Sequence, residues 1–263
     1  MLKPSLEEVK ALAKQYNTIP VFYEFSADNQ TPLNIYTAFS GKSRNSFIFE
    51  SVSNGVQWDR YSFIGFAPKQ EIRISGKQAE IRTEKGTQTL AVEQPIAFLK
   101  EQMAAFHAPV IPGAPNFTGG LIGYFGYDTV RYMEKKLTNI PEDDIHMPDC
   151  HLFLYEELIA YDHLTSNGIV ILNLHTDGDL GAQYAAAQWR AEELADTIRH
   201  YNPQPQEQHH QGESVVRSNL TKEQYSQMVQ DAKEYIRNGD IFQIVLSQRF
   251  EISNPPDSFS VYR

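Results

Sequence analysis

The clearest hydrophobic pattern of the chain lies near its end, where apolar residues recur at helical spacing. Six of them define one helical face: Tyr225, Met228, Val229, Ala232, Tyr235 and Ile236. Thr221 and Gln224 match a capping box, in which each side chain binds an otherwise unpaired backbone N–H group. Asn238-Gly239 supplies the left-handed residue that ends many helices. The pattern therefore predicts a helix between Thr221 and Gly239.

Residues 241–252 alternate as side chains do across a β-strand. One face is mainly apolar and carries Phe242, Ile244, Leu246 and Phe250. The other carries Gln243, Ser247 and Arg249. A half-solvated strand would show this pattern, but so apolar a face favours a strand buried on both sides. Buried polar groups need partners, because an unmade hydrogen bond costs about 1–3 kcal/mol. A polar ligand in a cavity is one candidate partner.

The first 200 residues favour antiparallel sheets with a few helices. Period-two alternation predicts strands at 47–52, 58–66, 71–75, 79–83, 151–162 and 169–175. Gly76-Lys77 and Asn167-Gly168 lie between such runs and predict hairpin turns. Helical patterns follow the capping pair Ser5 and Glu8, begin at Pro95, and span about residues 180–200. Strands joined mostly as hairpins indicate an α+β fold.

The domain organisation is predicted from one polar stretch. Residues 201–217 begin with a long run that lacks aliphatic side chains, which is typical of a linker or exposed loop. We therefore expect a domain over residues 1–200 and the start of a second unit over 218–263. His209-His210 falls in this polar stretch and is expected to be solvated.

Composition narrows the class of protein. The chain has 263 residues, a net charge of −10 and a single cysteine, Cys150. The acidic balance argues against nucleic-acid binding, which normally requires a basic patch. No apolar run approaches the ~18 residues of a membrane span, so no membrane partner is expected. A lone cysteine forms no internal disulfide, and a cytoplasmic location is expected.

Glu50 is the first candidate binding residue. On a strand it shares a face with Ile48 and Val52, and a buried carboxylate needs a cation. One candidate cation is Arg60: a three-residue hairpin turn sets Glu50 opposite Arg60, whereas a two-residue turn sets it opposite Asp59. The other candidate is the ammonium group of a bound amino acid.

Two further motifs are assigned to packing. Gly120, Gly123 and Gly126 are spaced three apart, which is not the dinucleotide-binding pattern, and glycines in a strand usually mark a bulge or a close backbone approach. The Asp149-Cys150-His151 run, with His146 nearby, lacks the paired spacing of a structural zinc site. We predict neither a dinucleotide nor a metal at these positions.

Four segments in order resemble component I of anthranilate synthase. They are SFIFES (46–51), WDRYSFIGFAP (58–68), FTGGLIGYFGYD (117–128) and KEYIRNGDIFQIVLSQRF (233–250). The resemblance runs from about residue 15 to the end and implies an α/β sandwich with flanking helices. Members of that family are close to twice this long. The chain would therefore hold an N-terminal regulatory domain and the first helix and strand of an incomplete chorismate-binding domain.

The resemblance also implies function. The family converts chorismate and ammonia into anthranilate and pyruvate, uses Mg²⁺, receives ammonia from a glutamine amidotransferase subunit, and is inhibited by L-tryptophan. Glu50 and Ser51 match its Leu-Leu-Glu-Ser element, which contacts the tryptophan effector; Ile48-Phe49 replaces the two leucines. Gln243 stands where isochorismate-forming relatives carry a lysine base. An amide takes up no proton at neutral pH, so Gln243 favours amination over water addition.

No Mg²⁺ ligand and no complete catalytic set is assigned to this chain, because the family's metal-binding carboxylates lie in the other half. We expect the chain alone to be inactive. Two alternatives stay open: a fragment of aminodeoxychorismate synthase component I, and a non-catalytic amino-acid-binding module that uses Glu50.

Overall fold

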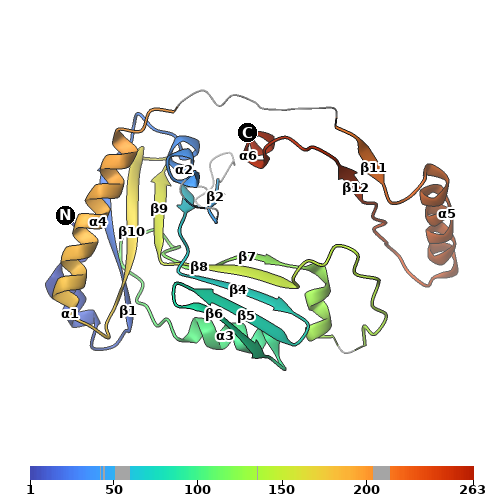
Figure 1. The fold of residues 1–263 in the computed structure, drawn as a ribbon, viewed down its shortest axis with the longest axis horizontal. Helices are drawn as coiled ribbons and strands as arrows, with labels where there is room; N and C mark the ends of the chain where they lie inside the picture. The colour runs from blue at the N-terminus through green and yellow to red at the C-terminus, as the bar shows by residue number, and fades with distance from the viewer. Residues whose placement is uncertain (42, 44, 51–59, 135, 204–213) are drawn as a thin grey trace. The chain divides into compact units, whose positions relative to one another are not determined.

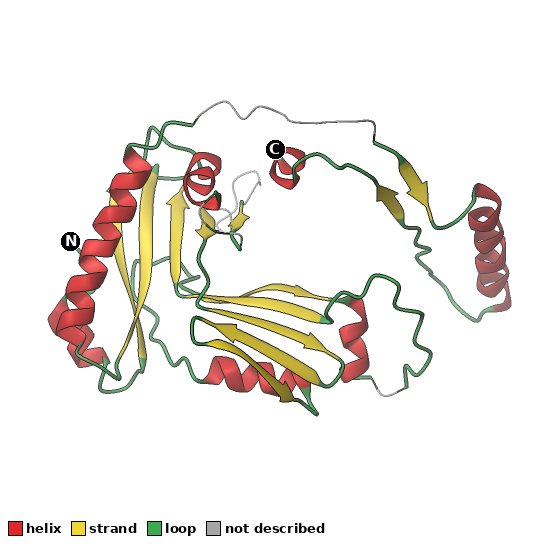
Figure 2. Cartoon of the chain, in the orientation of Figure 1, coloured by secondary structure: helices red, strands yellow, loops and turns green. Residues whose placement is uncertain are grey.

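A computed structural model describes residues 1–41, 43, 45–50, 60–134, 136–203 and 214–263 (Figure 1). The chain divides into two compact units, Met1–Pro203 and Gln204–Arg263. The first combines antiparallel sheets with helices, as the sequence predicts, and the α+β class is confirmed (Figure 2). Within the described residues, every helix is too short or too polar to cross a lipid bilayer.

The first sheet of this unit is entirely antiparallel. Its described strands, in order across the sheet, are β1 (Thr18–Ser26), β10 (Asn167–His175), β9 (Glu157–Asp162), β3 (Tyr61–Gly65) and β2 (Phe47–Phe49). Strand β2 therefore lies at one edge. The antiparallel order brings the end of β2, the start of β3 and the end of β9 to the same end of the sheet.

The second sheet has the described strands, in order, β6 (Gly86–Ala91), β5 (Gln78–Thr83), β4 (Gln70–Ser75), β8 (Cys150–Tyr155) and β7 (Gly120–Phe125). The chain passes between the sheets twice. Strand β3 continues into β4 after a short connection, and Glu156 alone separates β8 from β9.

Helices cover the outer face of each sheet (Figure 1). The described helices of this unit are α1 (Leu6–Leu12), α2 (Pro32–Ser40), α3 (Pro95–Ala104), the 3₁₀ helix η2 (Tyr127–Tyr132) and α4 (Leu180–Arg199). One core cluster joins α1, α2 and α4 to the first sheet, and a second joins α3 to the second sheet. A third cluster, which includes Phe22, Leu158 and Ile171, packs against aromatic residues of the second sheet. This arrangement agrees with the expected sandwich with flanking helices.

The predicted helix ends are confirmed where local chemistry determines them. Ser5 and Glu8 form the capping box of α1, and Pro95 occupies the first turn of α3. Helix α4 begins after Asp179, whose carboxylate accepts the N–H groups of Gly181 and Ala182. These contacts involve neighbours in the sequence, so the amino-acid pattern is sufficient to locate them.

The structure corrects two details of the strands predicted near β9. Residues 151–162 form two strands in different sheets, because the chain changes sheet at Glu156. The hairpin predicted at Asn167-Gly168 is confirmed, because β9 and β10 pair antiparallel, but its turn lies earlier in the chain: β10 starts at Asn167, and the turn before it contains Ser166 with φ at 56°. Gly168 lies against Phe25, where a Cβ atom would overlap the phenyl ring. Glycine at this position therefore leaves room for the Phe25 ring of the neighbouring strand β1.

The second unit contains β11 (Val216–Ser218), α5 (Lys222–Asn238), β12 (Phe250–Ile252) and α6 (Ser258–Tyr262) among its described residues. The capping box of Thr221 and Gln224 and the left-handed Gly239 (φ 79°) are confirmed. The strand predicted over 241–252 is not: β12 begins only at Phe250. The predicted burial on both faces is also wrong, since Phe242 is 94% exposed. A strand needs a hydrogen-bonded neighbour, and the described residues supply one only to β12, from β11.

Candidate functional site

Glu50 directly follows the edge strand β2 and is half-buried. Neither predicted hairpin register is correct. Strand β2 pairs Phe47 with Gly65 and Phe49 with Phe63, so the same register places Glu50 level with Ser62. The connection between β2 and β3 is thus longer than either turn considered from the sequence. Its residues 51–59, including the predicted effector contact Ser51, lie outside the described part of the chain.

Arg60, one cation considered for Glu50, binds Asp162. Its Nε and Nη2 atoms donate to Oδ1 and Oδ2 at 2.9 and 2.6 Å. Asp162 is 1% exposed, and it also accepts the Leu164 N–H at 3.0 Å and the Thr165 hydroxyl at 2.9 Å. The buried carboxylate therefore has both a cation and neutral donors.

These contacts set the charge of Asp162. Burial by itself opposes ionisation, but the hydrogen bonds from Arg60, Leu164 and Thr165 outweigh it and lower the pKa of the carboxyl group. The same pair raises the pKa of Arg60, chiefly through the hydrogen bond to Asp162. An ion pair thus fixes the start of β3 against the end of β9.

Ser62 and His163 form a second polar contact beside this pair, with 2.8 Å between Oγ and Nε2. A serine next to a histidine is the arrangement of a nucleophile and its base. Ser62 is fully buried, however, and a substrate carbonyl cannot reach its hydroxyl group. The contact therefore stabilises the pairing of β3 with β9, and we assign no chemistry to it.

The fold brings Glu50, Arg60, Ser62 and Asp162 to one end of the first sheet. Of the sequence-predicted effector residues, the structure places Glu50 here. Sequence analysis missed Asp162. An Asp at the end of a strand is a turn signal, because its side chain can accept a hydrogen bond from the backbone N–H two residues later, as Asp162 does from Leu164. A half-buried carboxylate at the edge of a sheet is chemically suited to an ammonium group.

The other residues singled out from the sequence lie elsewhere. Gln243 is exposed in the second unit, in the segment between α5 and β12. A Cβ atom at Gly123 would overlap the carbonyl oxygen of His151, so the close backbone approach predicted there is confirmed. His209-His210 falls outside the described residues.

The Asp149-Cys150-His151 run has protein partners. Asp149 accepts the Gly76 N–H and the Tyr132 hydroxyl through Oδ2. Cys150 is fully buried, and His151 Nε2 lies 2.7 Å from Glu71 Oε1. Across the described ranges, no three His, Cys, Asp or Glu side chains gather as metal ligands would, and none of these residues is assigned to Mg²⁺.

Comparison with known proteins gives a consistent result. The profile of the family described as chorismate binding enzyme matches residues 52–263. "Anthranilate synthase component 1" of Acetivibrio thermocellus is 38% identical over 275 residues, covering 100% of this chain and 54% of that protein. The protein of the same name from Pseudomonas aeruginosa is 35% identical and covers 98% of this chain and 53% of its own length.

The fold leads to the same group of proteins. The crystal structure of anthranilate synthase component I from Streptococcus pneumoniae TIGR4 matches with a TM-score of 0.61 and 27% identity. The match covers 81% of this chain and 46% of that one. The chain thus spans about half the length of the curated relatives and of this structure.

Proposed function

Because the chain belongs to the family of chorismate-binding enzymes, we propose that it is the N-terminal part of an anthranilate synthase component I. The longer protein would convert chorismate and ammonia into anthranilate and pyruvate, with a glutamine amidotransferase subunit as the ammonia source and the cytoplasm as its location. One observation carries the proposal: the likeness to component 1 extends over the full chain, and the fold agrees with it.

The first unit would be the regulatory part, with L-tryptophan as its effector. Glu50 would accept hydrogen bonds from the effector ammonium group, and Ser51 would hydrogen-bond the same ligand. The half-buried position of Glu50 supports this role, because partial desolvation strengthens a charge-assisted hydrogen bond.

The second unit would begin the chorismate-binding domain. Mg²⁺ would bind the chorismate carboxylate in the longer protein and offset its charge. Ammonia would add at C2 as the C4 hydroxyl group leaves, and pyruvate would then be eliminated. Gln243 would line that site as a neutral amide that cannot activate water. The chain alone would be inactive, since a site without its other half cannot hold the transition state.

A chimera tests the proposal. Residues 1–263 are joined to the remaining half of the Acetivibrio thermocellus relative, and anthranilate fluorescence is followed with chorismate, ammonium and Mg²⁺. The unjoined chain and the unjoined second half serve as controls. We expect anthranilate from the chimera and none from either control. A folded but silent chimera would refute the proposal.

The non-catalytic alternative has its own test. If the chain is a self-sufficient amino-acid-binding module, tryptophan at ~100 times Kd would stabilise it by about 2.7 kcal/mol. Titration calorimetry of the 263-residue chain with L-tryptophan measures this directly. We expect weak or no binding, because the other half of the effector site would come from the second half of the longer protein. Tight binding to the chain would favour the module.

A further inference from the structure

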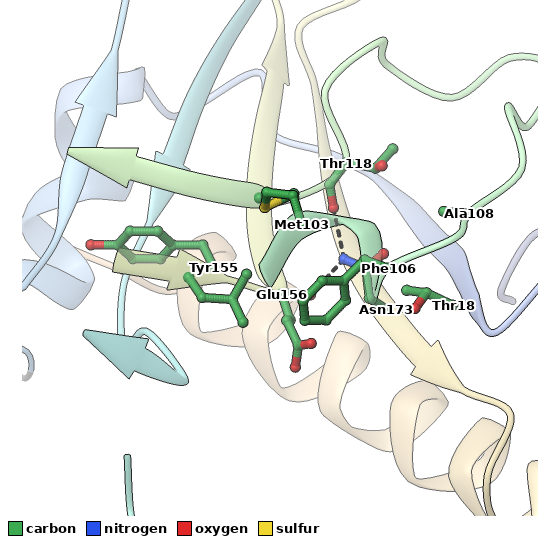
Figure 3. A pocket seen from close by; sticks show the side chains of 11 residues that line it. Thr18, Met103, Phe106, Ala108, Thr118, Tyr155, Glu156 and Asn173 are labelled. Atoms are coloured by element: carbon green, nitrogen blue, oxygen red, sulfur yellow. Dashed lines mark hydrogen bonds between the residues drawn. The ribbon is translucent and has the colours of Figure 1, made fainter. Parts of the chain in front are cut away.

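A cavity of about 130 Å³ lies within the first unit, at the point where the chain changes sheet (Figure 3). Its walls come from β1, β10, the end of α3, the start of β7 and the crossover residue Glu156. Glu156 and Asp162 stand at opposite ends of β9, about 20 Å apart by the rise of a strand, so the cavity is separate from the Glu50 end.

The polar side chains of this cavity present acceptors. Asn173 Nδ2 donates to the carbonyl oxygens of Thr118 at 2.7 Å and of Glu156 at 2.9 Å. Because those carbonyls only accept, the amide nitrogen is fixed toward them and Oδ1 is left as an acceptor. The Thr18 hydroxyl likewise donates its hydrogen bond to a protein group, Asn17 Oδ1, at 3.1 Å. Two of the lining side chains have thus used their donors on the protein.

Glu156 adds a negative charge to this lining. Its carboxylate is 17% exposed, and Oε1 accepts a hydrogen bond from His175 Nε2 at 2.8 Å. A carboxylate offers about four acceptor positions, so one contact leaves most of them available. Within the described residues, Oε2 has no hydrogen-bond partner. A partly buried carboxylate with spare acceptors favours a cationic donor over a neutral one.

The rest of the wall is mainly apolar. Met103, in the last turn of α3, and Phe106, just after that helix, line the cavity (Figure 3). Leu154 of β8 lines it as well. The volume is comparable to that of an engineered cavity of about 150 Å³ that holds benzene. A ligand of roughly six non-hydrogen atoms would fill it.

The backbone beside the cavity is fixed in a conformation that glycine favours. Gly119 and Gly120 have φ values of 150° and 140°. A Cβ atom at Gly119 would come within 2.9 Å of both Asn173 Nδ2 and the Tyr155 carbonyl oxygen. The glycine therefore permits the close approach that holds the Asn173 amide in place. The acceptor geometry is preformed, which lowers the entropic cost of binding.

From the acceptor lining, the charge of Glu156 and the apolar walls, we infer that this cavity binds a small primary ammonium compound with a short branched or cyclic apolar body. The ammonium group hydrogen-bonds Glu156 and Asn173, and the apolar body packs against Met103, Phe106 and Leu154. The inference does not depend on the proposed function, because none of its residues belongs to the Glu50 end.

The test uses 3-methylbutylamine hydrochloride as the probe and 3-methylbutan-1-ol as its neutral isostere. Both are titrated into the ¹⁵N-labelled 263-residue chain while the amide signals of Gly119, Gly120 and Asn173 are followed by NMR. We expect saturable binding of the amine with a Kd on the order of 1 mM. The alcohol should bind at least about tenfold more weakly, since it lacks the charge. Equal binding of the two, or shifts spread over the surface, would overturn the inference.

Variants locate the site. Glu156→Gln should weaken amine binding at least about tenfold, whereas Glu101→Gln, which removes an exposed carboxylate from the neighbouring helix α3, should leave it unchanged. Met103→Ala enlarges the cavity and should shift preference toward 2-phenylethylamine. An unaltered Kd in Glu156→Gln would exclude this carboxylate as the ligand. Should Glu156→Gln fail to fold, the amine and alcohol titrations of the unaltered chain decide the question.

Discussion

Arg60 and Asp162 form a two-point ion pair across β3 and β9, with Nε–Oδ1 at 2.9 Å and Nη2–Oδ2 at 2.6 Å. The Asp162 side chain is almost completely buried, while the Arg60 side chain is 43% exposed. The pair closes the end of the sheet at which the chain leaves β2 and returns in β3.

Removing the cation should cost stability. Arg60→Leu leaves Asp162 buried with neutral donors only, and we expect a loss of about 2–3 kcal/mol, below the range for fully buried pairs because Arg60 is partly in solvent. Urea unfolding measures it. Arg82→Leu is the matched control: Arg82 is 54% exposed and contacts Glu71 and Glu80 at 3.6 and 3.7 Å, so it should cost under about 1 kcal/mol. Equal losses would mean that burial of Asp162 is unimportant.

The same pair predicts a pH dependence. The folded-state pKa of Asp162 is lowered, so its contribution is fully present above the unfolded value of about 3.9 and is lost as pH falls below that value through the folded pKa. Asp162→Asn should therefore show less loss of stability between pH 5 and about pH 2 than the unaltered chain. Urea midpoints across this range measure the difference. Parallel curves for the two proteins would contradict the prediction.

Gly123 and Gly41 form a contrasting pair. Gly123→Ala places a methyl group onto the His151 carbonyl and must push β7 from β8, so we expect a loss of at least about 3 kcal/mol. Gly41 caps α2 with φ at −68°, and a Cβ atom there meets nothing within 4 Å. Gly41→Ala should be neutral or stabilise by up to about 1 kcal/mol. Thermal unfolding of both variants measures the two effects: the steric overlap in Gly123→Ala and the lower conformational entropy of the unfolded chain in Gly41→Ala.

Cys150 should be unreactive in the folded chain. Burial, and secondarily the charge of Asp149, raises the pKa of its thiol to about 11. At pH 8 the native chain should react with Ellman's reagent at least about a hundredfold more slowly than the chain in 8 M urea, where the thiol is exposed with an ordinary pKa of about 8.5. It is the only cysteine of the chain, so absorbance reports on it directly. Rapid reaction of the native chain with the reagent would show that the Cys150 thiol is exposed to solvent and would contradict the prediction.

Glu50→Gln should reduce effector sensitivity in the chimera described above. The substitution removes the charge that would bind the tryptophan ammonium group, and a charge-assisted hydrogen bond is worth about 1.5–3 kcal/mol. The tryptophan concentration for half inhibition should rise at least about tenfold with little change in uninhibited rate. Glu84→Gln, in the exposed turn after β5, should leave inhibition unaltered. Unchanged inhibition of Glu50→Gln would remove this residue from the effector site.

Local signals were read well from the sequence. The capping boxes at Ser5 and Thr221, the proline that begins α3 and the left-handed Gly239 all depend on neighbours within four residues. Their energetics are contained in the segment itself. The close backbone approach predicted for Gly123 of β7 is also confirmed, although the sequence does not identify His151 as the neighbour.

Long-range pairing was read less well. Glycine at position 168 looks the same whether it makes a turn or accommodates the ring of Phe25 from another strand. Alternation over residues 151–162 is compatible with one strand or two, because the change of sheet at Glu156 preserves it. Glu156 and Asn173, which define the cavity, carried no signal, since 17 residues separate them and only the fold makes them hydrogen-bond partners.

The sequence by itself determined the α+β class, the helix ends, and the presence of an acidic residue after β2 within a recognisable family pattern. Only the tertiary structure decided that Glu50 lies level with Ser62, that Arg60 is held by Asp162, and that a change of sheet opens a cavity beside Glu156. The reason is physical. Caps and periodic faces are set by interactions within a few residues, whereas strand register and charge pairing are set by contacts between segments that come together only when the chain folds.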